Sequence, residues 1–131
     1  MEIEKVSGDY RPLILVAEDD DSNFKLIKAI IGKKCEILWA KNGEEIVNLF
    51  EENRDKAEAI LMDIKMPRMD GLEATHIIRS YSKDIPIIAL TAYAFEADKE
   101  LALEMGCNDF VTKPISERTL RKALDKYSTT V

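Results

Sequence analysis

Five short apolar runs recur along the chain, and an amphipathic stretch of ten or more residues follows each of them. The runs are too short for helices and rich in aliphatic side chains, which predicts β-strands at 13–17, 37–40, 59–62, 86–90 and 109–112. Strands that alternate with helices are typical of βα units around a parallel sheet. The first, third and fourth runs are almost wholly apolar, as in interior strands, whereas the second alternates and suits an edge.

Capping residues predict the limits of the five helices. Ser22 is expected to cap the first helix, and Gly106 suits the position after the fourth, which is expected to run from about 94 to 105. The other helices are expected to open at Asn42 or Gly43, at Gly71 and at Ser116. The apolar face of the first helix should carry Leu26, Ile27, Ile30 and Ile31.

Length and composition fit one globular domain. The chain has 131 residues, of which 46% are hydrophobic and 34% charged. We expect a single domain at 11–127 with flexible ends at 1–10 and 128–131. The charged start argues against a signal peptide, and no apolar run approaches a membrane span, so a cytoplasmic location is expected. A net charge of −6 argues against direct nucleic-acid binding.

Polar residues stand where the predicted strands end. Glu18 and Asp19 follow the first strand, Asp63 the third, Thr91 the fourth and Lys113 the fifth. The carboxyl ends of parallel strands share one edge of the sheet, where ligands bind in open α/β folds. Carboxylates brought close together repel each other, and a hard divalent cation removes that repulsion. Oxygen donors without thiolate or imidazole favour Mg²⁺ over Zn²⁺.

Each of these residues has a simpler interpretation when taken alone. Lys113 could be a structural ion-pair partner, Thr91 could bond its own backbone, and a single Asp at a strand end is usually a helix cap. Independent caps, however, would not need to place a cation site, a hydroxyl donor and a fixed positive charge on one edge. Their convergence favours one functional site over independent structural roles.

Five segments in order resemble the receiver domains of two-component response regulators, over about 11–127. They are Ile14-Leu-Val-Ala-Glu18-Asp19-Asp20, Leu61-Met-Asp63-Ile-Lys65-Met66-Pro67, Asp70-Gly71, Ala89-Leu-Thr91-Ala92 and Phe110-Val-Thr-Lys113-Pro114-Ile115. One segment would be weak support, whereas five at these spacings are specific. The stretch from Leu61 to Thr75 resembles receivers joined to hybrid sensor histidine kinases more than those joined to DNA-binding domains.

The resemblance implies a fold and a set of roles. The fold is a doubly wound five-stranded parallel sheet, (βα)5, in the flavodoxin-like order 2-1-3-4-5. Asp63 accepts the phosphoryl group from a phosphohistidine of a histidine kinase or a histidine phosphotransfer domain. Mg²⁺ is bound by Asp19, Asp63 and the backbone carbonyl of Lys65, with Glu18 acting through water. The Thr91 hydroxyl, the Ala92 amide and the Lys113 ammonium contact the phosphoryl group.

The resemblance further implies a switch rather than a turnover enzyme, with slow self-dephosphorylation. Thr91 and Phe110 are the switch residues, and the surface that changes is formed by the fourth helix, the fifth strand and the fifth helix. Two positions depart from the common pattern, because Glu18 stands where Asp is commoner and Phe110 where many members have Tyr. A homodimer is compatible with the family, as is a place in the cytoplasmic part of a membrane-bound hybrid kinase.

Three rival functions remain at this stage. An aspartate-nucleophile phosphatase would need an acid two residues after Asp63, where Lys65 stands. A flavin-binding module would need a neutral phosphate loop after the first strand, where Glu18 begins an acidic run. A receiver-like module that binds its partner without phosphorylation is the alternative that the residues exclude least.

Overall fold

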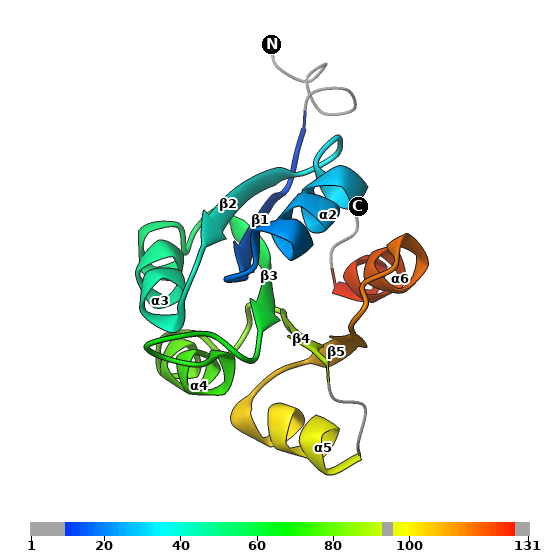
Figure 1. Ribbon diagram of the computed structural model, residues 1–131. Coiled ribbons are helices and arrows are strands. Elements are labelled where there is room, and N and C mark those ends of the chain that lie inside the picture. Colours follow the sequence, from blue (N-terminus) through cyan, green and yellow to red (C-terminus); the bar gives the residue numbers. More distant parts are fainter. Residues whose placement is uncertain (1–9, 93–95, 128–131) are drawn as a thin grey trace.

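The computed structural model describes residues 10–92 and 96–127, which form one parallel sheet covered by helices (Figure 1). The strands lie in the order β2-β1-β3-β4-β5, so the strand order reverses between β1 and β3. This is the doubly wound, flavodoxin-like arrangement that was predicted. The strands are β1 (Leu13–Ala17), β2 (Glu36–Ala40), β3 (Ala57–Asp63), β4 (Ile87–Thr91) and β5 (Asp109–Thr112).

Five helices cover the two faces of the sheet, α3, α4 and α5 on one and α2 and α6 on the other (Figure 1). Alternate β1 residues serve the two cores: Leu13, Leu15 and Ala17 pack in the first, and Ile14 and Val16 in the second. Burial of both faces explains why this strand reads as a continuous apolar run. The helices are α2 (Asp21–Ile31), α3 (Gly43–Glu52), α4 (Gly71–Tyr81), α5 (Glu96–Met105) and α6 (Glu117–Tyr127).

Most predicted helix limits are confirmed. Asn42 caps α3 by accepting a hydrogen bond from the Glu45 amide, and Ser116 accepts one from the Thr119 amide at the start of α6. Gly106 has φ of +118° after α5. The amides of Gly106 and Cys107 donate to the carbonyls of Leu103 and Ala102, which is a Schellman closure.

Two predictions about the first helix were wrong. Asp20, not Ser22, caps α2, because its carboxylate accepts a hydrogen bond of 2.9 Å from the Ser22 amide. Leu26 is 39% exposed, so the buried stripe of α2 is narrower than the sequence pattern indicated and comprises Ile27, Ile30 and Ile31.

Some predictions fall outside the described residues. They are the flexible ends, apart from Tyr10, and the start of the fourth predicted helix at 94–95. Among the helices that the structure describes, none is long and apolar enough to cross a membrane.

Candidate functional site

Glu18 lies directly after β1 and is fully buried. Its amide continues the sheet by donating to the Ala40 carbonyl at 2.9 Å, and its Oε2 accepts a hydrogen bond of 3.2 Å from the Asp20 amide. The other oxygen, Oε1, lies 3.3 Å from Lys113 Nζ but accepts no hydrogen bond from the described residues. A buried carboxylate oxygen without a hydrogen bond is costly, which indicates that a further group completes this site.

Asp63 ends β3 and is only 3% exposed. Its Oδ1 lies 3.1 Å from Lys113 Nζ. Burial, and then the negative charge and hydrogen bonding of Glu18, raise the pKa of Asp63 to about 7, although Lys113 acts in the opposite direction. The single ammonium therefore does not fully offset the cost of ionising Asp63 next to a second buried acid.

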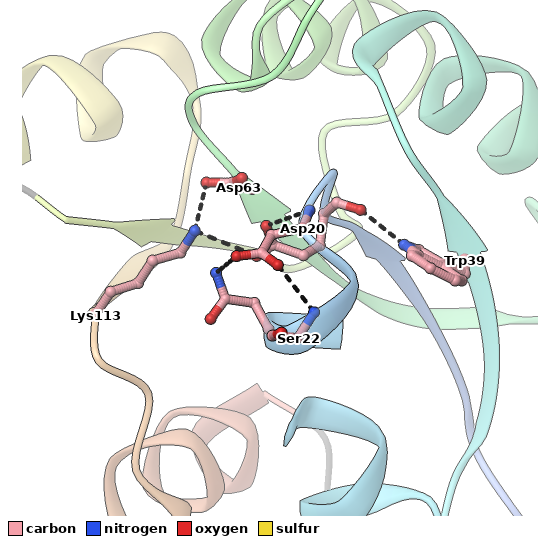
Figure 2. A network of polar contacts seen from close by, with 7 residues as sticks. Asp20, Ser22, Trp39, Asp63 and Lys113 are labelled. Atoms are coloured by element: carbon pink, nitrogen blue, oxygen red, sulfur yellow. Dashed lines mark hydrogen bonds and ion pairs between the residues drawn. The ribbon is translucent and has the colours of Figure 1, made fainter. Parts of the chain in front are cut away.

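Lys113 follows β5 and reaches both acids (Figure 2). Burial alone would lower the pKa of Lys113, but its hydrogen bond to Asp63 and the charges of Asp63 and Glu18 together raise it. The Lys113 amide donates to the Thr91 carbonyl at 2.7 Å, and the peptide bond to Pro114 is cis. The ammonium is thus a fixed positive charge at the edge of the sheet.

One ligand oxygen from each of Glu18, Asp19 and Asp63 lies within 4.8 Å of the others, and Asp19 is exposed to solvent. Hard carboxylate oxygens at a solvent-accessible edge suit Mg²⁺, which keeps several of its own waters. The buried Glu18 Oε1 without a hydrogen bond agrees with a bound water or cation at this point. The residues present therefore fit the predicted cation.

The structure brings all the predicted binding residues around one hollow of about 280 Å³. Asp20 and Asn23 at the start of α2 also line it. Phe110 does not: it lines a neighbouring hollow of about 330 Å³ beneath α5, which Thr91, Ile64 and Lys65 share. Thr91 therefore stands between the two hollows. The predicted residues at the first hollow are Glu18, Asp19, Asp63, Lys65, Thr91, Ala92 and Lys113.

Two glycines shape the site in a way that the sequence analysis missed. The Gly71 amide donates to the Ile64 carbonyl at 2.8 Å, and a Cβ on Gly71 would lie 2.1 Å from the Asp63 carbonyl oxygen. Gly43 donates to the Met69 carbonyl, and a Cβ there would lie 2.2 Å from the same oxygen. Both positions need glycine because a backbone approaches closely. The sequence showed Gly71 only as a helix start.

Trp39 was also missed. Its indole Nε1 donates a hydrogen bond of 2.7 Å to the Glu18 carbonyl (Figure 2). Its ring stacks on Phe24. Phe24, on α2, is partly buried in this stack. Residues 21 positions apart in sequence give no local signal of such a bond.

Known proteins similar to this chain agree with the geometry. Over 120 residues the chain is 43% identical to the hybrid signal transduction histidine kinase I of Dictyostelium discoideum, covering 86% of this chain but only 7% of that protein. The receiver domain of the sensor histidine kinase PA1611 from Pseudomonas aeruginosa, solved with a magnesium ion in its active site cleft, superposes with a TM-score of 0.80 at 33% identity. The match covers 90% of this chain and 98% of that one.

A second solved structure contains a partner. It is the Saccharomyces cerevisiae histidine phosphotransfer protein Ypd1 with the receiver domain of its response regulator Ssk1, matched with a TM-score of 0.84 at 31% identity over 92% of both chains. The family model of the response regulator receiver domain matches residues 14–125. The chain therefore belongs to the response regulator receiver domains, which are modules of two-component signalling rather than turnover enzymes.

Proposed function

We propose that this chain is a phosphoacceptor in a phosphorelay and takes a phosphoryl group onto Asp63. The observation that carries the proposal is the grouping of Asp63 with the carboxylates of Glu18 and Asp19 and with the Lys113 ammonium, which lies 3.1 Å from Asp63. Phosphoryl transfer asks a protein mainly for positioning and charge stabilisation. A buried nucleophile that adjoins a cation site and a fixed ammonium supplies both. The proposed limits of the domain are 11–127.

The reaction is a transfer between two side chains. An Asp63 oxygen attacks the phosphorus of a phosphohistidine in line, a P–O bond forms and the P–N bond breaks, and the bonding electrons leave on the imidazole, which takes up a proton. Lys113 pairs with the negative charge on the phosphoryl oxygens, and the Thr91 hydroxyl and the Ala92 amide donate hydrogen bonds to them. Asp19, Asp63 and the Lys65 carbonyl would hold Mg²⁺, with Glu18 acting through water. When bound, Mg²⁺ would supply positive charge that offsets the negative charge of the phosphoryl oxygens.

The product is an acyl phosphate, which water cleaves slowly. The donor is a histidine kinase or a histidine phosphotransfer domain. The Ypd1–Ssk1 receiver complex supports this pairing because the Ssk1 receiver is 31% identical to this chain. Such donors obtain their phosphoryl group from ATP, so we propose that the transfer takes place in the cytoplasm. We propose that the readout is a shift of Thr91 and Phe110 that changes the surface of α5, β5 and α6.

The test is the intact mass after incubation with Mg²⁺ and acetyl phosphate. The parent protein should gain one phosphoryl group only when Mg²⁺ is present, and Asp63→Asn should gain none. Asp21→Asn serves as the matched control, because Asp21 is an exposed acid at the first position of α2 that does not line the hollow, and it should be modified like the parent.

If the folded parent gains no phosphoryl group either from acetyl phosphate or from a phosphorylated histidine phosphotransfer domain, the proposal is wrong. The chain would then act as a receiver-like binding module without phosphorylation. A modified Asp63→Asn variant would place the acceptor elsewhere.

A further inference from the structure

Trp39 is the only tryptophan of the chain and lies at the edge of the sheet, on β2. Its ring stacks on Phe24 of α2, with centroids 3.9 Å apart and planes inclined by 2°, and Lys41 Nζ lies 4.6 Å from the ring centroid. The indole Nε1 points to the acidic loop and donates to the Glu18 carbonyl (Figure 2). The side chain is therefore fixed by contacts to two elements.

The two peptide planes that flank Glu18 are anchored differently. The plane before it is held by the ordinary ladder, since the Glu18 amide donates to the Ala40 carbonyl. β1 ends at Ala17, so the ladder does not hold the next plane, between Glu18 and Asp19. The carbonyl oxygen of that plane is the atom that accepts the 2.7 Å hydrogen bond from Trp39. The Trp39 side chain thus anchors the backbone one peptide beyond the end of the β1 ladder.

This second plane sets the direction in which the Asp19 side chain leaves the backbone, because it contains the Asp19 amide nitrogen. Asp19 is exposed, and beyond it the chain turns into α2 at Asp20. A free rotation of the plane would swing the Asp19 carboxylate away from Asp63 and Glu18, whose oxygens it approaches within 4.8 Å. Holding the plane keeps the three carboxylates together despite their repulsion.

We propose that Trp39 is a positioning residue for the cation site, acting through the Glu18–Asp19 peptide rather than by contact with the cation. The inference rests on the proposed function, because it requires that Glu18, Asp19 and Asp63 bind Mg²⁺. Hydrogen bonds from groups that orient metal ligands without binding the metal themselves typically change metal affinity about 10–100-fold. Here the bond is one step further from the ligand atoms, so we expect the lower end of that range.

The test compares two variants that each remove one part of the arrangement. Trp39→Phe keeps an aromatic ring to stack on Phe24 but loses the N–H, whereas Phe24→Leu loses the stack but keeps the N–H. The dissociation constant for Mg²⁺ is measured by calorimetry on the full chain, and thermal unfolding in chelator reports the fold. Trp39→Phe should raise the dissociation constant roughly tenfold. Phe24→Leu should leave the dissociation constant within about threefold of the parent's value, even if it lowers the unfolding temperature in chelator as much as Trp39→Phe does.

The outcomes separate this inference from the proposed function. A parent protein that binds no Mg²⁺ overturns both. A parent that binds Mg²⁺ with the same affinity as a folded Trp39→Phe variant overturns the role of Trp39 alone. Equal losses of affinity in the two variants would also overturn it, because the effect would then follow packing rather than the hydrogen bond.

A measurement on the parent covers the case in which Trp39→Phe does not fold. The chain has a single indole N–H, which gives one resonance in a nitrogen–proton correlation spectrum. Saturation with Mg²⁺ should shift this resonance and slow the exchange of its proton with water, since cation binding and the carbonyl hydrogen bond favour the same orientation of the peptide. An unchanged resonance with unchanged exchange at saturating Mg²⁺ would overturn the proposal.

Discussion

The carboxyl-terminal edge of the sheet has two halves that are built differently. In the half at β1 and β3, Glu18 and Asp63 are buried. The Ala40 carbonyl and the Trp39 indole of β2 both hydrogen-bond to the Glu18 backbone. Gly71 lets the start of α4 approach the Asp63 backbone closely. The half at β4 and β5 borders the hollow of about 330 Å³ that Thr91 and Phe110 line. Binding residues come from both halves, since Thr91 and Lys113 line the same hollow as Glu18 and Asp63. We propose that the half at β1 and β3 is rigid and that the movement on phosphorylation is confined to the looser half.

The helices repeat this contrast. α2, which follows the acidic loop, buries three isoleucines, whereas α5 over the second hollow buries only Ala102 and leaves Leu101 and Leu103 45% and 48% exposed. Elements with few buried apolar contacts are those that open or shift at low cost in free energy. A two-state change is therefore expected at α5 and not at α2.

Truncating one apolar side chain in each helix gives the largest expected effect. Ile27→Ala removes a fully buried side chain of α2 and should lower the free energy of unfolding by about 2–5 kcal/mol. Leu101→Ala on α5 should change it by less than about 0.5 kcal/mol, because the side chain is largely exposed already. Urea unfolding in chelator measures both. Comparable losses would show that α5 is as firmly packed as α2.

The pH dependence of stability probes the rigid half through Asp63. The unfolded chain loses this proton near pH 3.8, and the folded, metal-free protein keeps it until about pH 7. The raised pKa thus favours the folded state below about pH 4, and this contribution is lost as the pH rises to about 7. Relative to Asp63→Asn, the parent should become less stable over that interval. Urea unfolding of both proteins in chelator measures the difference, and a difference that does not vary with pH would contradict it.

The strand ends alone predicted that Glu18, Asp19, Asp63, Thr91 and Lys113 would share one edge, because parallel strands bring their carboxyl ends together. Lys65 and Ala92 were named only through the family resemblance. The sequence could not predict how the members are held. Four successive residues from Asp19 to Ser22 are all good helix caps, so the choice of Asp20 depends on where the chain turns after β1. The bonds of Trp39 to Glu18 and of Gly71 to Ile64 join separate elements, and only the folded backbone brings them together.

A smaller effect concerns what holds the ring of Phe110, the proposed switch residue, in the looser half. Lys99 of α5 places its ammonium 4.8 Å from the centroid of the Phe110 ring. Phe110 lacks the hydroxyl that many receivers have at this position, so a cation–π contact is the polar attraction that the structure gives it. A double-mutant cycle with Lys99→Met and Phe110→Leu should yield a coupling of about 0.5–1 kcal/mol. Strict additivity would show that Lys99 does not hold the ring.

Asp19→Asn is also expected to change stability only slightly, and the sign of the change is what makes it informative. Asp19 lies close to two buried acids but is itself exposed, so removing its charge should stabilise the metal-free protein by less than about 1 kcal/mol. In saturating Mg²⁺ the parent should gain stability by mass action, about 2.7 kcal/mol at one hundred times its dissociation constant, whereas the variant should gain less. The ranking of the two proteins in thermal melts should therefore reverse between chelator and Mg²⁺. A variant that melts below the parent in chelator would mean that Asp19 stabilises the loop structurally, and the rigid half would then owe its arrangement to packing rather than to a balance of charge that a cation completes.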